Sequence, residues 1–273
     1  MNTTVVCLLA LFAFGSAAVL HLQKNNTEPV PSHFWSERII NGEEATPGEF
    51  PHQVTLLRNG YHMCGGSIIG IGNALTAAHC VDGQAVNSLA VVVNLHDFSS
   101  PGNYIWFDLD EVFVHNDYNT GPGGFPNDVA VLNLRPNEHD ITPNIIPLAS
   151  GSQTYAGQTC KISGWGVTES GSGSNVLLKA DVRVLSHSEC VAEWGSNNIV
   201  SSQHICVKGD EGNGQGACNG DSGGPLVCDG VLAGATSWGR SGCHIGGVVT
   251  HPSVYARITS FNSWIRANCA TCP

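Results

Sequence analysis

Short apolar runs separated by turn residues recur along most of the 273-residue chain. Strands of this length and spacing favour sandwiches or barrels over alternating strand–helix units. Segment 135–153, which contains three prolines, lies between two series of such runs and predicts a crossing between two all-β units. The runs of the first series are 54–57, 67–71, 89–95, 112–114 and 129–134, and those of the second are 160–163, 180–185, 225–228, 231–237 and 253–258.

Only two stretches have a helical pattern. Residues 186–194 form a short one, and residues 259–268 place Phe261, Trp264 and Ile265 at positions i, i+3 and i+4. This spacing predicts a helix at the C-terminus that packs its apolar stripe on the second β unit.

Composition excludes several classes of protein. With 42% hydrophobic and 12% charged residues, the chain has enough apolar side chains for a core, unlike a disordered protein. The formal net charge of -11 disfavours nucleic-acid binding, because that binding depends on Lys and Arg neutralising phosphates.

The eleven cysteines are widely spaced, which indicates a disulfide framework in an oxidising compartment. The apolar run 5–14, followed by the small residues 15–18, predicts a secretory signal peptide over 1–18. Its removal takes away Cys7 and leaves an even number of cysteines. A membrane anchor is the alternative, but a span needs about 20 apolar residues, and polar residues from His21 onward interrupt this run. We therefore expect a secreted, extracellular protein with no membrane partner.

Residues 19–38 are polar and have no periodicity, so they form either a flexible arm or a removable pro-segment. Asn25, Asn26 and Thr27 form a glycosylation sequon, which makes Asn25 a candidate sugar attachment site.

Three short segments carry candidate chemistry. Ser222 lies in the glycine-rich sequence GDSGGP (220–225), where neighbouring glycines let a substrate carbonyl approach. His79, in LTAAHC (75–80), is a candidate base for this hydroxyl. Asp128, at the head of the apolar run NDVAVL (127–132), is a candidate carboxylate partner of the histidine. Each segment alone has an ordinary structural interpretation as a turn or a surface residue.

Taken together, the segments resemble the chymotrypsin–trypsin family of serine endopeptidases, whose chain order is His, Asp, Ser. Further matching segments are IING (39–42), CGGS (64–67), SGWG (163–166) and SWG (237–239). The resemblance covers 39 to about 267. It implies two packed six-stranded antiparallel Greek-key barrels, about 39–145 and 146–273, with a C-terminal helix and an active site between the barrels.

The resemblance also assigns catalytic roles. Ser222 corresponds to the nucleophile, His79 to the base that later protonates the leaving amine, and Asp128 to the carboxylate that orients the histidine. The N–H groups of Gly220 and Ser222 correspond to the oxyanion hole. Ser237 corresponds to the residue bonded to the aspartate.

Activation of a zymogen is a second implication. Cleavage after Arg38 would release the amino group of Ile39, which in this family pairs with the aspartate before the nucleophile, here Asp221. The pair compensates the cost of burying two charges. On this interpretation 19–38 is an activation propeptide and 39–273 is the protease domain.

The resemblance places Gly216 at the floor of the specificity pocket, where an acidic residue would select Lys or Arg. Gly239 and Ser253 correspond to walls, and Ser237, Trp238 and Gly239 to the edge that pairs with substrate. The implied preference is for apolar or aromatic residues, as in chymotrypsin, elastases and crustacean collagenolytic enzymes. A separate trypsin-like protease would then be needed to cut after Arg38.

Four disulfides follow from the family pattern: Cys64–Cys80, Cys160–Cys228, Cys190–Cys206 and Cys218–Cys243. Cys269 and Cys272 depart from it and pair either with each other or with another chain. Two thiols are half a zinc ligand set, and segment 94–103 lacks the acids of a calcium loop, so no metal or cofactor is expected.

The competing class is a non-catalytic homologue that uses the fold as a binding module, against which all three candidate catalytic residues argue. The expected partners of the enzyme are protein or peptide substrates and an activating protease, and protein inhibitors are candidates. A monomer is expected.

Overall fold

The computed structural model describes residues 39–136, 144–166, 174–209, 214–241, 243 and 249–273. The predicted signal peptide with Cys7, the predicted propeptide with Asn25, and Arg38 lie outside these residues. No helix of the described residues has the length and apolar character needed to cross a bilayer.

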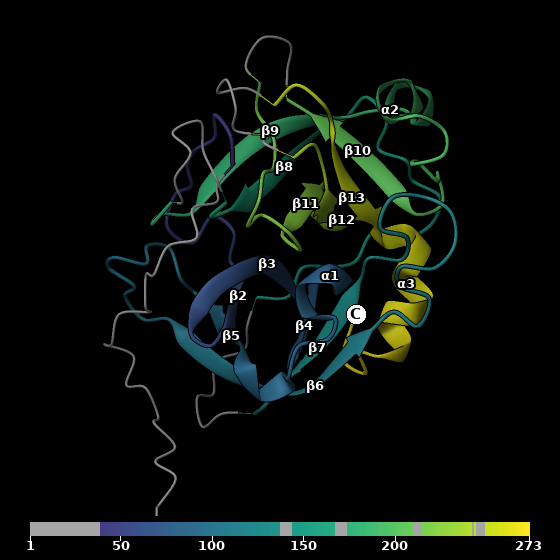
Figure 1. Ribbon diagram of the computed structural model, residues 1–273. Helices are drawn as coiled ribbons and strands as arrows, with labels where there is room; N and C mark the ends of the chain where they lie inside the picture. Colours follow the sequence, from purple (N-terminus) through teal and green to yellow (C-terminus); the bar gives the residue numbers. More distant parts are fainter. Residues whose placement is uncertain (1–38, 137–143, 167–173, 210–213, 242, 244–248) are drawn as a thin grey trace, which may run out of the picture.

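Two antiparallel barrels, one above the other in Figure 1, make up the described structure. The first closes in the order β2-β3-β4-β7-β6-β5. Its strands are β2 (Gln53–Arg58), β3 (Tyr61–Gly70), β4 (Asn73–Thr76), β5 (Leu89–Val93), β6 (Ile105–Val114) and β7 (Ala130–Leu134).

The second barrel repeats this topology in the order β8-β9-β10-β13-β12-β11, and pairing of β8 with β9 closes it. Counted within each barrel, the order is 1-2-3-6-5-4 in both, as in a Greek key. A two-residue strand, β1 (Glu43–Glu44), adds to β9. The barrel strands are β8 (Thr159–Gly164), β9 (Leu178–Val184), β10 (His204–Lys208), β11 (Pro225–Cys228), β12 (Val231–Trp238) and β13 (Ser253–Arg257). The predicted fold class is confirmed.

The apolar runs missed one strand in each barrel. β4 is short and leads directly into the segment that carries His79, and β10 has the sequence HICVK, whose ends are polar. Both pair with a strand on each side, so tertiary pairing rather than local pattern defines them.

Among the described residues, three α-helices and a short 3₁₀ helix, Val86–Ser88, accompany the barrels. Helix α2 (His187–Trp194) begins with a capping box in which Ser186 and Glu189 bond reciprocally. Helix α1 (Ala78–Val81) is one turn long and lies at the face of the first barrel that meets the second (Figure 1). Helix α3 (Ile258–Ala267) follows β13 directly, within a residue of the predicted bounds.

Separate hydrophobic clusters fill the two barrels, and a third joins them. This third cluster contains Leu75 and Val131 of the first barrel, Leu232 of the second, and Phe261 and Ile265 of α3. Helix α3 thus buries its apolar stripe at the junction of both barrels. The sequence had predicted packing on the second barrel alone.

The chain end returns to the first barrel. Cys269 and Cys272 form a disulfide with each other. The hydroxyl of Thr271 lies 2.9 Å from the carbonyl oxygen of Ile71, to which it donates, and 2.9 Å from Asn73 Oδ1. The four disulfides expected from the family pattern are also present.

Candidate active site

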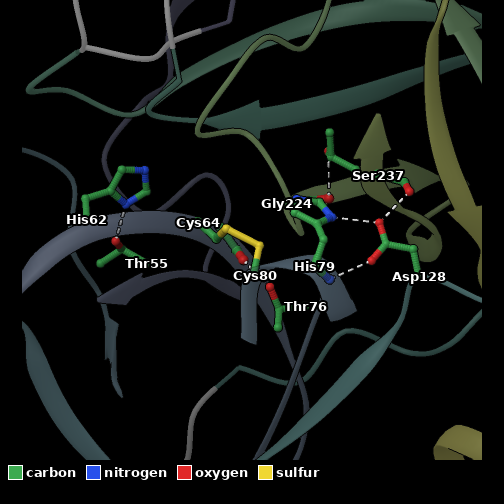
Figure 2. Close-up of a disulfide and its surroundings, with 11 residues drawn as sticks. Thr55, His62, Cys64, Thr76, His79, Cys80, Asp128, Gly224 and Ser237 are labelled. Atoms are coloured by element: carbon green, nitrogen blue, oxygen red, sulfur yellow. Dashed lines mark hydrogen bonds and ion pairs between the residues drawn. A yellow bond between two sulfur atoms is a disulfide. The ribbon is translucent and has the colours of Figure 1, made fainter. Parts of the chain in front are cut away.

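His79 and Asp128 come together where the barrels meet (Figure 2). One carboxylate oxygen of Asp128 lies 2.7 Å from His79 Nδ1, and the other accepts the backbone N–H of His79 at 2.8 Å. Two contacts from one carboxylate fix both the ring and the turn that carries it. The Cys64–Cys80 disulfide ties this turn to β3.

The carboxylate of Asp128 is held in turn by the second barrel. Ser237, in β12, donates its hydroxyl to Asp128 Oδ2 at 2.5 Å. Asp128 is 1% exposed, so these contacts compensate a carboxylate that has lost its water. With Nδ1 of His79 facing the carboxylate, Nε2 is the ring nitrogen that remains for proton transfer.

Ser222 lies in the bend before β11 and lines a cavity of about 470 Å³. Its carbonyl accepts the N–H of Gly65 at 2.8 Å, and the N–H of Gly223 donates to Thr236 at 2.7 Å, so both barrels hold the bend. No hydrogen bond joins Ser222 to His79 in the described structure. Such contacts are often long in a free enzyme and shorten when substrate binds.

The bend presents two unused donors. Neither the N–H of Gly220 nor that of Ser222 donates a hydrogen bond to any residue that the structure describes. Gly220 has φ of 83°, in the region that glycine tolerates best. Two adjacent free N–H groups beside a hydroxyl can receive a developing oxyanion.

The carboxylate of Asp221 points away from this cavity into the protein. It is 2% exposed and accepts the N–H groups of Gly166 at 2.9 Å and Cys218 at 3.0 Å. A Cβ at Gly164 or Gly166 would collide with the carboxylate, so these glycines make room for it.

Ile39 and Ile40 are fully buried in the second barrel's half of the molecule. Ile40 forms an antiparallel bridge with Gly216, its N–H donating to the carbonyl at 3.0 Å. The residues after Arg38 are therefore part of the packed structure around the bend.

Most of the expected pocket residues line the cavity with Ser222, namely Ser237, Trp238, Gly239 and Ser253. Gly216, the expected floor, does not. A Cβ at position 216 would meet the side chain of Val249, which does line the cavity. The described lining contains no acidic side chain.

Several lining residues were missed by the sequence interpretation, among them Phe125, Arg240, Val249 and His251. Phe125, 48% exposed, places its ring 5.9 Å from that of His79. Arg240 and His251 line the cavity from the second barrel, after β12 and before β13. Phe125 could have been noticed as an aromatic residue in a glycine-rich loop, three residues before Asp128. Val249 and His251 lie in the glycine-rich stretch 246–251, whose alignment with the family pattern was not fixed by the sequence.

A metal centre finds little support in the described residues. Their one cluster of close potential ligands is Cys64, His79 and Cys80, and both sulfurs are in a disulfide.

Two antiparallel Greek-key barrels with a His–Asp pair and a serine at their junction define a two-barrel serine hydrolase. Comparison with known proteins narrows this class. The Trypsin family profile matches residues 39–265. The chain is 37% identical over 250 residues to "Fibrinolytic enzyme, isozyme C" of Lumbricus rubellus, covering 84% of this chain and 99% of that protein.

It is 36% identical over 235 residues to "Trypsin beta" of Drosophila erecta (85% of this chain, 88% of that protein). It is 34% identical over 242 residues to "Chymotrypsin-like serine proteinase" of Haliotis rufescens (85% and 91%). The chain belongs to the trypsin family of serine endopeptidases and acts on protein substrates.

Proposed function

We propose that the protein is a secreted zymogen whose activated form hydrolyses peptide bonds with Ser222, His79 and Asp128. The observation that carries the assignment is the doubly bonded His79–Asp128 pair, with Nε2 left for a proton and Ser222 on the adjacent cavity.

In this mechanism Nε2 of His79 takes the proton from Ser222 as its oxygen bonds to the substrate carbonyl carbon. The carbonyl oxygen becomes negative and is stabilised by the free N–H groups of Gly220 and Ser222. The imidazolium then protonates the leaving amine as the C–N bond breaks. Water, deprotonated by His79, hydrolyses the acyl ester and restores the hydroxyl.

Activation would follow cleavage after Arg38. The burial of Asp221 supports this, because a new ammonium at Ile39 could enter a region where a carboxylate is already desolvated. Residues 1–18 would be the signal peptide and 19–38 the propeptide. Five disulfides among the described residues support an extracellular location.

The pocket would accept apolar or aromatic side chains before the scissile bond. Support comes from Val249 against Gly216, the open wall at Gly239, and the lack of a described acid in the lining. A trypsin-like protease would then be required to cut after Arg38.

The test uses the full chain expressed in a secretory host, treated with trypsin and freed of it. Wild type and Ser222→Ala are compared on a peptide library, and Ser100→Ala, a change at an exposed serine, is the matched control. We expect cleavage after apolar residues by wild type and Ser100→Ala only. Equal turnover by Ser222→Ala would contradict the catalytic assignment, and a profile dominated by Lys and Arg would contradict the pocket. N-terminal sequencing of the secreted and treated chains checks the two cleavage sites.

A further inference from the structure

Arg240 is the one permanently charged side chain among the described residues that line the cavity of Ser222. It follows Gly239 directly and is exposed. The cavity therefore has a cation at its wall, in a protein whose formal net charge is -11. Low-dielectric walls concentrate the field of such a charge inside a cavity.

The guanidinium is held in place by neutral groups. Its Nη1 donates to His251 Nδ1 at 3.1 Å and to Thr250 Oγ1 at 3.5 Å. Because Arg can only donate, Nδ1 of His251 is the acceptor. Both contacts use Nη1, so Nε and Nη2 have no hydrogen-bond partner in the described structure.

Arg240 also differs from five of the eight other Lys and Arg residues that the structure describes. It forms no ion pair with any described carboxylate, whereas five other side chains do: Arg135, Lys161, Lys179, Arg183 and Lys208. An anchored guanidinium with free N–H groups loses little side-chain entropy when it binds a planar anion. Its geometry suits the two oxygens of a carboxylate.

We propose that Arg240 selects substrates that carry an Asp or Glu shortly before the scissile bond. This inference rests on the proposed function and on the pairing of the substrate backbone with Ser237, Trp238 and Gly239 that the family resemblance implies. Ser237, at one end of this edge, bonds Asp128 of the catalytic pair, and Arg240 follows Gly239 at the other end. The carboxylate therefore belongs to the second, third or fourth residue before the bond, while an uncharged side chain enters the pocket.

The experiment uses paired reporter peptides with a fixed apolar residue before the leaving group and either Glu or Gln at the second, third or fourth position. The measured quantity is the ratio of kcat/KM for each Glu and Gln pair. We expect a ratio of about 5 for wild type at one of these positions, from one partly exposed charge-assisted contact. Arg240→Ala should bring it to about 1, Arg240→Glu below 1, and Arg240→Lys should retain part of it. About 0.5 M NaCl should reduce the wild-type ratio.

Arg58→Ala is the matched control, because it also removes one positive charge from the protein. Arg58 is exposed at the end of β2 and does not line the cavity. It should keep the wild-type ratio. A wild-type ratio near 1 at all three positions, or an unchanged ratio in Arg240→Ala, overturns the inference.

Turnover of the Gln peptides distinguishes a failure of the role proposed for Arg240 from a failure of the proposed function. Equal turnover by wild type and Arg240→Ala, without an advantage for Glu, refutes the role of Arg240 and leaves the protease assignment intact. Absence of turnover by activated wild type, at the level of Ser222→Ala, refutes the proposed function and this inference with it.

Discussion

The side chain of Val249 lies directly against Gly216: a Cβ at position 216 would stand 3.1 Å from both γ-methyl carbons of the valine. Position 216 was expected to form the pocket floor, where an acid would select basic substrates. Val249 separates it from the cavity. Conversion to a pocket for Lys or Arg therefore requires changes at two positions.

Gly216→Asp alone should not produce cleavage after Lys or Arg. The new side chain would crowd Val249 and bury a carboxylate without a partner, which we expect to cost about 1–3 kcal/mol of stability. Adding Val249→Ala should relieve the crowding and shift the peptide-library profile toward basic residues. A stable single variant that cleaves after Lys or Arg would show that Val249 does not screen this position.

Gly166→Ala should strongly reduce activity, because its Cβ would occupy the site of the Asp221 carboxylate and displace the bend that carries Ser222. Labelling with a serine-directed fluorophosphonate measures the fraction of competent sites, which we expect to fall at least about tenfold. Ser100→Ala, a change at an exposed residue that does not line the cavity, is the control. It should label normally, and normal labelling of Gly166→Ala would contradict the prediction.

Ser237→Ala should lower kcat about tenfold or more while the protein remains folded. The change removes a hydroxyl that donates to the buried carboxylate of Asp128, and hydrogen bonds to charged groups contribute roughly 1.5–3 kcal/mol. Steady-state kinetics check this, with Ser100→Ala as the control. A kcat equal to that of the control would mean that the hydroxyl does not stabilise the His79–Asp128 pair.

Stability should decrease as pH falls from about 6.5 to about 4. Burial lowers the pKa of His52, His62 and His204 to about 4 each. The unfolded chain therefore binds more protons than the folded one between these limits, and acidification favours unfolding; above about 6.5 the neutral form is common to both states. Thermal unfolding of wild type at pH 4.5 and 7.5 measures the loss.

A smaller loss of Tm is expected for His62→Gln, which removes one such group. Exposed His187→Gln serves as the control and should keep the wild-type dependence. If His62→Gln loses as much Tm as wild type over this range, burial of this imidazole does not contribute to the acid sensitivity.

Sequence patterns predicted the candidate catalytic residues and the two-barrel fold, but not the residues that form the cavity wall. The segments around His79, Asp128 and Ser222 are each contiguous, and their order along the chain is specific, so their likeness to one family could be recognised directly. The cavity wall could not be derived in this way. Val249 contacts Gly216 only because Ile40 and the second barrel bring the two segments together. The periodicity of apolar residues along the sequence does not predict such a contact.

The partners of Cys269 and Cys272 were also not predictable from the sequence alone. Their spacing left pairing with each other and pairing with another chain both open. The structure pairs them with each other, beside Gly70 of β3, where a Cβ would meet Cys269 Sγ at 2.8 Å. The disulfide fits here because residue 70 has no side chain. The two positions that must match are about two hundred residues apart in the sequence.

Thr271 contacts Ile71 and Asn73 of the first barrel, so the segment after α3 connects the two barrels a second time. The first connection is the chain segment 144–149, which is distant in sequence. A relative rotation of the barrels would have to stretch both. Since Ser237 of the second barrel bonds Asp128 beside the first, the contacts of Thr271 limit how far the two halves of the site can move apart. The C-terminus is thus a poor place for a fusion partner that pulls on the chain.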